Sequence, residues 1–484
     1  MKTIGLFVAT SIFLLFVSCK KNRTEAVNTP ISSIKISTGT IYPAFDLQIK
    51  DYYISSLNTL NTFQITLEDF KSSQIVYING IKVKEKVTNV KLKMEQDIKI
   101  EYQVNKDSFE VYTIHYLPKD MPKVNVILKK APSEGFILAN LSQLSLTTLP
   151  DYCYITILNN DGFPVYYKRL PYRGVINFRY FDIGNNQKRF TYNIDDLGKV
   201  EVMNEKFEVI KQLDLLPNRN HGALRSDNHD VLYFDDNHYV LPNYYTREKV
   251  DMSSYNGKSS IDIGEFLFQE IKDNKVIFEW DTRDHPELLD YTDPIYYQQY
   301  ATGQKVDYFH FNSISTDPND QNYIISARHT NQIYKVDRKT GGIIWRFGGK
   351  NDSFNLTGNK IISHPHHATI LSNGNLLLFD NGVTKNPKQS RIAEFSLDEK
   401  NFTANLVFEY TESGRYFDIM GSAQKLDNGN YLIGWGGNIT SQVNANKSDI
   451  TEVTANGDIV LDLSFTNNSM FVYSYRALKY KISF

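Results

Sequence analysis

The feature that most constrains the fold of this chain is an internal repeat of strand–turn–strand units. "HHATILSNGNLLLFDNG" from His366, "GSAQKLDNGNYLIGWGG" from Gly421 and "HGALRSDNHDVLYFDDN" from His221 each place an apolar strand after a turn that contains Asn, and "HFNSISTDPNDQNYIISAR" from His310 does so with a longer turn. Further paired strands close each unit, and two units with degenerate starts precede these. About six units of four strands each are the sequence signature of a β-propeller. The sequence therefore predicts an all-β chain with a six-bladed β-propeller over residues 123–484.

A second kind of region precedes the repeats. Over residues 33–122, segments such as "QIVYINGIKVK", "DIKIEYQV" and "FEVYTIHYL" alternate apolar and polar residues between turns. This period of two is typical of strands with one buried face. We expect a β-sandwich domain over 33–122, with "LPKDMPK" at 117–123 as the linker to the propeller. The stretch "GTIYPAF" resembles the opening of cadherin-like sandwich modules of bacterial surface proteins.

The N-terminus reads as an export signal. Residues 1–19, "MKTIGLFVATSIFLLFVSC", combine a basic residue with an apolar stretch that is too short to favour a spanning helix. The ending resembles a bacterial lipobox, in which Cys19 is lipidated and becomes the first residue; an ordinary cleaved signal is the alternative. Residues 20–32 are polar and are expected to form a tether. The predicted location is the bacterial cell envelope, lipid-anchored to the outer membrane on its periplasmic or surface face.

Composition and missing motifs exclude several classes of function. A net charge of −2 gives no reason to expect nucleic acid as a partner. No phosphate-binding G-x-x-x-x-G-K-[ST] motif occurs, and "FGGKND" at 347–352 has the wrong spacing. Cys153 is the one cysteine after Cys19, so the mature chain is expected to lack an internal disulfide. We expect no cofactor, and a homodimer is compatible with the chain.

Three of the ten histidines occupy one position of the repeat. His221, His310 and His366 each stand just before the first strand of a unit. Equivalent positions of successive propeller blades surround one axis, so these imidazoles are expected to converge at one end of the central channel, where propellers bind ligands. The remaining histidines of the domains have no such alignment and are expected on loops or in backbone hydrogen bonds: 115, 229, 238, 285, 329 and 364.

Two further residues are expected beside these histidines. Asn312 lies two positions after His310 and therefore on the same face of a strand. Arg328 ends the strand that pairs with the His310 segment, so it returns to the same end. An arginine among histidines, with no Asp or Glu in the matching positions, suits an oxyanion. A structural ion pair of Arg328 with a nearby carboxylate is the alternative.

These motifs resemble those of the bacterial arylsulfate sulfotransferase family. The resemblance rests on "DYFHFNSISTDPNDQNYIISARHT" at 307–330, "PHHATILSNGNLLLFDNG" at 365–382 and the strand pair "DRKTGGIIWRFGG" between them. It implies a β-sandwich followed by a six-bladed propeller, with His366 as the nucleophile. It further implies that His221, His310, Asn312 and Arg328 bind the sulfuryl group. The family has one histidine where this chain has two; strand register selects His366, and His367 is kept as the alternative.

The implied reaction moves a sulfuryl group from a phenolic sulfate ester to a phenolic acceptor through a sulfo-histidine. A neutral imidazole can attack sulfur and split one transfer into two steps, and a second imidazole can handle the phenol proton. Two other readings remain open. The first is a zinc-dependent hydrolase using the same histidines, although Arg328 argues against a dication and we expect no metal. The second is a non-catalytic anchored propeller that binds glycans or sulfated ligands.

Overall fold

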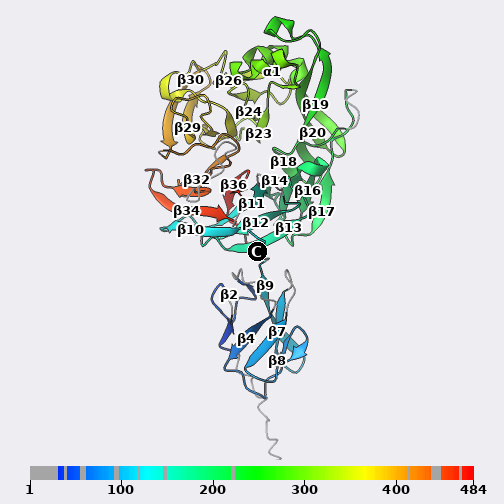
Figure 1. Cartoon of the computed structure of the whole chain (residues 1–484), viewed down its shortest axis with the longest axis vertical. Coiled ribbons are helices and arrows are strands. Elements are labelled where there is room, and N and C mark those ends of the chain that lie inside the picture. Colours follow the sequence, from blue (N-terminus) through cyan, green and yellow to red (C-terminus); the bar gives the residue numbers. More distant parts are fainter. Residues whose placement is uncertain are drawn as a thin grey trace, which may run out of the picture. The chain divides into compact units, whose positions relative to one another are not determined.

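The alternating segments become strands in both halves of the chain, as a computed structural model shows (Figure 1). The structure describes residues 31–37, 41–54, 62–91, 97–117, 120–144, 150–219, 224–412, 414–437, 448–467 and 471–483. The chain divides into two compact units, Met1–Lys119 and Asp120–Phe484, so the boundary falls inside the segment 117–123. Cys19 and the leader lie outside the described residues.

The first unit contains two sheets that share one hydrophobic core. One sheet has the order β1 (Ser33–Ile36), β4 (Thr62–Glu68), β7 (Val87–Lys91). The other has the order β2 (Ile41–Tyr42), β3 (Asp51–Ile54), β9 (Ser108–Tyr116), β8 (Ile98–Asn105), β5 (Val76–Ile78), β6 (Ile81–Lys82). Ile34 and Ile65 from the first sheet pack in the same cluster as Ile100 and Tyr112 from the second. Every second residue is buried along Ile98–Tyr102 of β8 and along β5, as a period of two requires.

The described part of the second unit forms six sheets that follow one another along the chain. The first sheet has the order β13 (Pro164–Leu170), β12 (Cys153–Leu158), β11 (Phe136–Leu144), β35 (Phe471–Tyr473), with β36 (Ala477–Tyr480) also on β11, and the second has the order β14 (Val175–Asp182), β15 (Lys188–Ile194), β16 (Lys199–Met203), β17 (Val209–Leu213). The third has the order β18 (Leu232–Asp235), β19 (His238–Val250), β20 (Ile261–Lys272), β21 (Lys275–Asp281), with β22 (Val306–Asp307) on β20, and the fourth has the order β23 (Phe311–Thr316), β24 (Tyr323–Ala327), β25 (Gln332–Val336), β26 (Ile343–Phe347). The fifth has the order β27 (Pro365–Ile370), β28 (Leu376–Asp380), β29 (Arg391–Asp398), β30 (Thr403–Tyr410), and the sixth has the order β31 (Ser422–Lys425), β32 (Tyr431–Gly434), β33 (Ile450–Val453), β34 (Ile459–Thr466), β10 (Lys123–Lys129).

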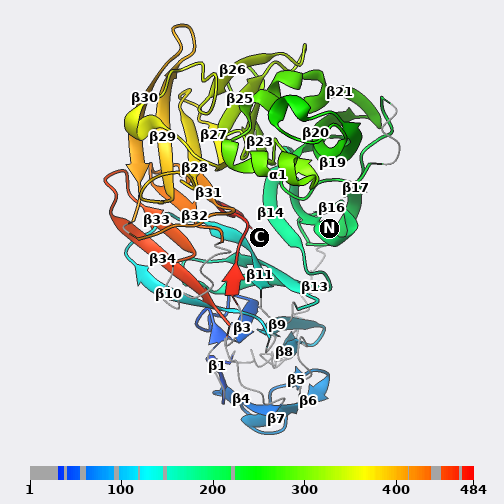
Figure 2. The same ribbon diagram turned by 45° about the horizontal axis from the view of Figure 1, so that its top comes forward.

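The two ends of this unit are tied together by strand pairing. β10 adds to the outer edge of the last sheet, with Lys123 opposite Thr466, and β36 adds to the first sheet, with Ala477 opposite Ala139. The sheets therefore close on themselves through both ends of the chain. Figure 2 shows them in sequence order, from cyan through green and yellow to red, around a common centre.

The first strands of neighbouring sheets contact one another near this centre. Nδ2 of Asn312 in β23 donates to the carbonyl of Pro365 in β27 (3.0 Å), and Oγ of Ser422 in β31 donates to the carbonyl of Ala477 in β36 (3.0 Å). The residues that begin these strands are thereby placed beside one another. This arrangement positions the candidate site.

Helical structure in the described residues is short. The segment between β21 and β22 contains three 3-10 helices, η3 (Thr282–Asp284), η4 (Pro286–Tyr291) and η5 (Pro294–Tyr296), followed by α1 (Tyr297–Thr302). Its Leu288 and Tyr300 are buried in the core of the β18–β21 and β23–β26 sheets. The other 3-10 turns are η1 (Asp195–Leu197), η2 (Ser253–Tyr255) and η6 (Gly358–Lys360). None of the helices in the described ranges is long and apolar enough to cross a membrane.

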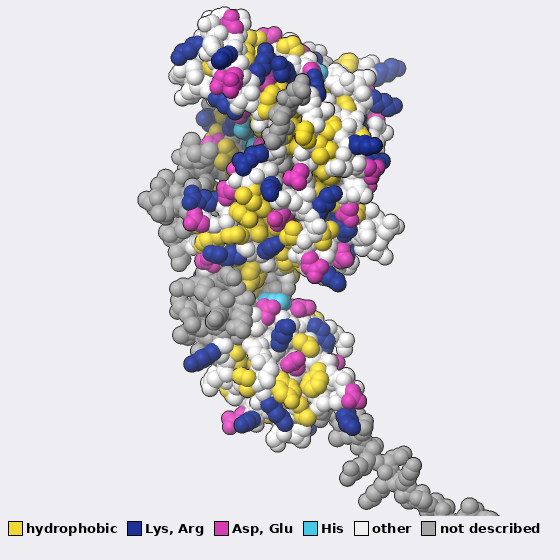
Figure 3. Space-filling model, turned by 90° about the vertical axis from the view of Figure 1, so that its right-hand side faces the viewer, with side chains coloured by type: hydrophobic (Ala, Val, Ile, Leu, Met, Phe, Trp, Pro, Cys, Tyr) yellow, Lys and Arg dark blue, Asp and Glu magenta, His cyan; other side chains and the backbone are white. Residues whose placement is uncertain are grey.

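The surface carries charges of both signs. On the face drawn in Figure 3, Lys and Arg side chains are interspersed with Asp and Glu side chains.

Candidate active site

Histidines gather where the first strands of the sheets begin. His310 directly precedes β23, and His366 is the second residue of β27. The ring of His310 lies 4.4 Å from that of His329 and 5.4 Å from that of His229, measured between centroids. Tyr475 connects the two sides, because its ring lies 5.9 Å from His229 and 6.3 Å from His366. We call the following residues the mouth cluster: His229, Asp307, His310, Arg328, His329, His364 and His366.

Arg328 stands in the mouth cluster without a carboxylate. Its Nη1 donates to the hydroxyl of Tyr296 (2.6 Å) and to Nε2 of His329 (2.9 Å), and its Nη2 donates to the carbonyl of Asp418 (3.0 Å). Its Nε is buried and has no hydrogen-bond partner among the described residues. No described Asp or Glu side chain forms an ion pair with this guanidinium, so the structural alternative for Arg328 is not found there. The charge remains available to an anion.

His329 and His364 are neutral rings held by the same network. Nδ1 of His329 donates to the carbonyl of Asp307 (2.5 Å), which leaves Nε2 as the acceptor for Arg328. His364 lies 3.0 Å from Oγ of Ser363 through Nδ1 and 2.9 Å from the Tyr296 hydroxyl through Nε2. Burial, together with the charge of Arg328, lowers the pKa of His364 to about 3. Burial also lowers the pKa of His329 well below its usual range, with His310 adding to the effect.

His310 is paired with a carboxylate. Its Nδ1 lies 2.5 Å from Oδ2 of Asp307, and no described residue bonds to its Nε2. His310 has a φ of +50°, a left-handed conformation that is uncommon outside glycine. Burial raises the pKa of Asp307, but the neighbouring His310 and His329 outweigh it and hold the pKa below its usual range. Asp307 stays ionised and orients Nε2 of His310 into the cluster.

His229 forms a second imidazole–carboxylate pair. Its Nδ1 lies 2.7 Å from Oδ1 of Asp227. Burial lowers the pKa of His229, but the charge of Asp227 and the bond to it outweigh burial, so the pKa lies above its usual value. The pair with Asp227 therefore favours the cationic form of this ring.

The position of His229 corrects the register of the predicted repeat. The alignment that starts at His221 makes "VLYFD" a second strand, yet β18 is the first strand of its sheet and pairs with β19 as β27 pairs with β28. "HDVLYFDDNHYVL" from His229 is the segment that matches "HHATILSNGNLLL" from His366. The alignment chose the wrong start because the segments from His221 and from His229 both begin with His and both contain Asn before an apolar run. His221 itself lies outside the described residues.

His366 is buried, neutral and fixed in one tautomer. Nδ2 of Asn381 donates to the carbonyls of Phe417 (2.7 Å) and Met420 (3.0 Å), so Oδ1 of Asn381 accepts from Nδ1 of His366 (2.5 Å). Nε2 of His366 carries the lone pair and accepts the backbone N–H of Met420 (2.8 Å). Burial and the charge of Arg328 lower the pKa of His366 well below its usual range. The ring therefore has the protonation state of a nucleophile.

His367 and Asn312 lie beside a different group of residues. Nδ1 of His367 bonds to the backbone carbonyl of Ala423 (3.0 Å), and burial with the charge of Arg476 lowers the pKa of His367 to about 3. Nδ2 of Asn312 is used by Pro365, and its carbonyl accepts from Tyr475 (2.9 Å) and from Nη2 of Arg476 (2.8 Å). Oδ1 of Asn312 is buried without a partner among the described atoms, so this side chain offers an acceptor.

All of these residues fall within the match to a family model. The model of the arylsulfotransferase (ASST) family matches residues 185–476, which is more than half of the chain. The chain belongs to the arylsulfotransferase family. It is accordingly a sulfotransferase, and the family implies small-molecule substrates.

Other comparisons add little to this assignment. The search of curated proteins found none that matches this chain. A protein of unknown function from Bacteroides caccae is 12% identical with a TM-score of 0.41, covering 72% of this chain and 99% of that one. The β-propeller domain of Myceliophteria thermophila Cps50 is 8% identical with a TM-score of 0.34, covering 71% and 100%. Catalytically inactive virginiamycin B lyase from Staphylococcus aureus is 13% identical with a TM-score of 0.31, covering 69% and 88%. These likenesses are too low to carry an argument.

The described part of the arylsulfotransferase contains one group with the spacing of metal ligands. Ligand atoms of Asp307, His310 and His329 lie within 4.8 Å of one another. This differs from the predicted rival set of His221, His310 and His366. Both nitrogens of His329 are already bonded, and Nη1 of Arg328 lies 2.9 Å from its Nε2. A fixed positive charge at that distance opposes a divalent cation.

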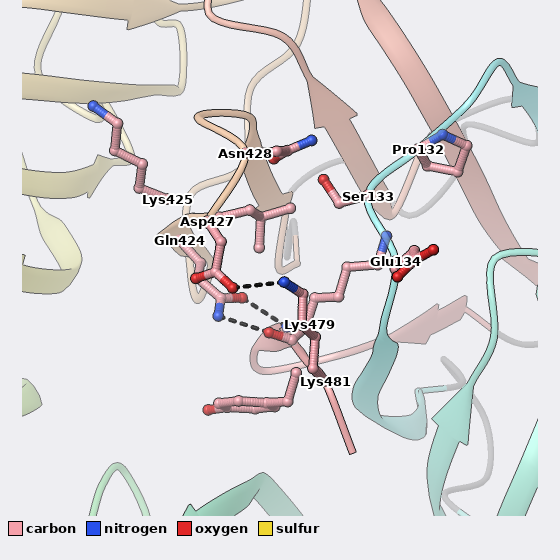
Figure 4. A pocket seen from close by; sticks show the side chains of 11 residues that line it. Pro132, Ser133, Glu134, Gln424, Lys425, Asp427, Asn428, Lys479 and Lys481 are labelled. Carbon is pink, nitrogen blue, oxygen red and sulfur yellow. Dashed lines mark hydrogen bonds and ion pairs between the residues drawn. The ribbon is translucent and has the colours of Figure 1, made fainter. Parts of the chain in front are cut away.

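A hollow of about 490 Å³ lies at the other ends of the first strands (Figure 4). It is lined by the ends of β31 and β36 and by residues 132–134. Its cations are paired: Lys481 with Asp427 (2.9 Å), Lys479 with Glu452 (2.7 Å) and Lys425 with Glu394 (2.8 Å). Paired charges leave this hollow less suited to an anionic substrate than the mouth cluster.

Sequence reasoning missed several members of the site. His229, His329 and His364 were expected on loops or in backbone bonds, and Asp307 and Tyr296 were not considered. The register of "HDVLYFDD" with "HHATILSN" is the signal that identifies His229. No sequence signal identifies Tyr296, because the segment that carries it lies outside the repeat.

Proposed function

We propose that this enzyme moves a sulfuryl group from a phenolic sulfate ester to a phenolic acceptor through a sulfo-histidine on His366. The observation that carries the proposal is Arg328, a guanidinium without a described carboxylate partner, set among imidazoles. Sulfuryl transfer spreads charge over three oxygens, by analogy with phosphoryl transfer, and fixed donors at those oxygens are the main catalytic contribution.

His366 is the proposed nucleophile because its tautomer presents Nε2. Attack uses the lone pair that accepts the Met420 N–H, so that hydrogen bond breaks as sulfur arrives. The released N–H then lies beside the sulfuryl oxygens and donates to them, as Arg328 does. His367 remains the alternative nucleophile, since no described residue bonds to its Nε2.

His310 is proposed to transfer the phenol proton, and His229 is proposed to stabilise the negative charge of the sulfuryl oxygens. His310 is backed by Asp307 and presents Nε2, which suits a group that protonates the departing phenolate and later deprotonates the acceptor. In its cationic form, which Asp227 favours, His229 stabilises the sulfuryl oxygens. His221 keeps its proposed place at the sulfuryl group. Asn312 holds the Pro365 carbonyl and thereby positions the His366 strand.

The architecture proposed around this site is a six-bladed β-propeller preceded by a β-sandwich. The six sheets of the second unit and the closure by β10 and β36 support the blades, and the shared core of two sheets supports the sandwich. We further propose that Cys19 is lipidated and that the chain is held in the bacterial cell envelope. Lipid at Cys19 is tested by intact mass of the mature protein.

A chromogenic aryl sulfate with a phenol acceptor tests the function. The expected result is release of the donor phenolate that depends on the acceptor, with ping-pong kinetics and a sulfuryl group on His366 when donor is supplied alone. A sulfuryl group on His367 would move the nucleophile to that residue. Donor cleavage without any labelled histidine would replace the covalent route by direct transfer.

The metal-dependent hydrolase is the second candidate: the ligand spacing of Asp307, His310 and His329 favours it, whereas the charge of Arg328 opposes it. It predicts free sulfate instead of a sulfated acceptor. Stoichiometric zinc in the purified protein, with activity lost to a chelator and restored by zinc, would support it.

A further inference from the structure

One phenol of the chain itself already lies in the mouth cluster. Tyr296 ends η5, where Asp293 caps the turn by accepting the N–H of Ile295 (3.0 Å). Nδ2 of Asn331 donates to Asp293, while Oδ1 of Asn331 accepts the N–H of His364 (2.8 Å). Asn331 thereby joins the inserted segment that carries Tyr296 to His364, which directly precedes β27.

The hydroxyl of Tyr296 has the surroundings of a bound acceptor. It accepts from Nη1 of Arg328 (2.6 Å) and lies 2.9 Å from Nε2 of His364. Oγ of Ser363 accepts the N–H of Thr384 and contacts its hydroxyl, so Nδ1 of His364 can donate to Oγ, and Nε2 is left to accept the phenol proton. The ring of Tyr296 stacks on His329 with centroids 3.6 Å apart.

Arg328 connects this phenol to the proposed nucleophile. Its Nη2 donates to the carbonyl of Asp418, and Met420, two residues later, contacts Nε2 of His366. Two other tyrosines near His366 and His310 bond to backbone: Tyr475 donates to the carbonyl of Asn312, and the hydroxyl of Tyr244 accepts the N–H of Phe311. Among these three phenols, Tyr296 alone contacts the guanidinium.

We propose that Tyr296 is an intramolecular acceptor that becomes O-sulfated by the enzyme's own site. This inference rests on the proposed function, because the sulfuryl group reaches Tyr296 from sulfo-His366. The bond between sulfur and Nε2 of His366 breaks and its electron pair returns to the imidazole, while the phenol oxygen forms the new S–O bond. The phenol proton passes to Nε2 of His364 and from that acidic imidazolium to water, and the sulfate ester is left beside Arg328.

The direction of the transfer follows from phenol basicity. A sulfate ester of a more basic phenol holds its sulfuryl group more strongly, because the phenolate is the poorer leaving group. An ordinary tyrosine phenol has a pKa of about 10, and it is more basic than 4-nitrophenol because the nitro group withdraws electrons from the ring. Transfer from the ester of an acidic phenol, such as 4-nitrophenyl sulfate, to Tyr296 is therefore downhill.

The test is peptide mapping of the full chain after incubation with 4-nitrophenyl sulfate and no added acceptor. We expect one sulfuryl group on Tyr296, less of it when an excess of free phenol competes, and none in Tyr296→Phe. Tyr297→Phe is the matched control: Tyr297 is the adjacent tyrosine, packs on Tyr300 and takes no part in the site, so Tyr296 stays labelled. His364→Gln should slow labelling of Tyr296 by about 10²-fold relative to turnover with free phenol, as expected for loss of a general base.

Release of 4-nitrophenolate separates failure of this inference from failure of the proposed function. Donor cleavage and sulfation of free phenol, with Tyr296 unmodified, would overturn the inference and leave the function standing. A sulfuryl group on Tyr297, Tyr475 or Tyr244 in place of Tyr296 would also overturn it. Absence of donor cleavage would overturn both.

Discussion

Two arginines near the centre of the second unit have opposite surroundings. Arg476 donates from Nη1 to Oδ1 of Asp230 (2.8 Å) and to Oδ1 of Asn177 (2.9 Å), and both ionic side chains are 1% exposed. Arg179 shares the same carboxylate (2.8 Å). Arg328 has polar contacts but no described carboxylate. A buried charge that is paired maintains the fold, whereas one surrounded by neutral imidazoles is left to bind an anion.

The paired group also joins sheets. Oδ2 of Asp230 accepts the N–H of Ile314 in β23 (3.0 Å), and Nη2 of Arg476 donates to the carbonyl of Asn312 (2.8 Å). We call Asp230, Arg179, Arg476 and Asn177 the buried ion network. If the comparison is right, changes in this network lower stability, and changes in the mouth cluster lower activity without lowering stability.

His366→Ala tests the mouth cluster with the largest expected effect. Loss of a covalent nucleophile costs on the order of 10⁶-fold in turnover. Turnover of an aryl sulfate and labelling by the donor alone measure it, and both should disappear. His367→Ala should keep the label and lose less activity; the reverse pattern would assign the nucleophile to His367.

Asp230→Ala should chiefly affect stability. It leaves Arg179 and Arg476 as uncompensated buried charges, and breaking such a pair costs about 3–5 kcal/mol in the free energy of unfolding. Urea unfolding measures this loss. Asp427→Ala, which breaks the exposed pair with Lys481, is the control and should leave the unfolding midpoint unchanged. Equal midpoints in the two variants would refute the structural role of the network.

Arg328→Ala should show the converse pattern. Loss of one preorganised donor costs about 10²–10³-fold in turnover. Because no described carboxylate is left unpaired, the urea midpoint should stay near that of the unchanged protein. A fall in stability like that of Asp230→Ala would mean that Arg328 maintains the fold, and the contrast between the two arginines would be lost.

The pH dependence of His229 should give the smallest effect. Asp227 raises the pKa of His229, so the cation stabilises the fold at low pH, and this contribution is lost as pH rises through the raised pKa. The alkaline limb of kcat/KM should follow the same loss of a proton. Asp227→Asn should move that limb to lower pH. The control is Asp97→Asn beside His115 in the first unit, which should leave the limb in place. An unmoved limb in Asp227→Asn would remove His229 from the chemistry.

The alternation and the repeats along the sequence are sufficient to predict an all-β chain, as the strands confirm. "HFN…SAR" and "PHHATI…FDNG" were sufficient for the family, which the match over residues 185–476 confirms. These features are local, since strand periodicity and motif spacing are written along the chain. His310, Arg328 and His366 were selected on that basis, and the structure places all three in the mouth cluster.

Tertiary structure decided the parts that depend on partners far away in the sequence. The pairing of β18 with β19 shows that the repeat unit begins at His229. Sequence alignment alone could not decide this, because the segments from His221 and from His229 are similar. Asn381 sets the tautomer of His366, Asp307 orients His310, and Tyr296 reaches Arg328 from an insertion. Sequence supplies which groups can react, but protonation and orientation depend on burial and on hydrogen bonds between distant segments, which exist only once the sheets have closed.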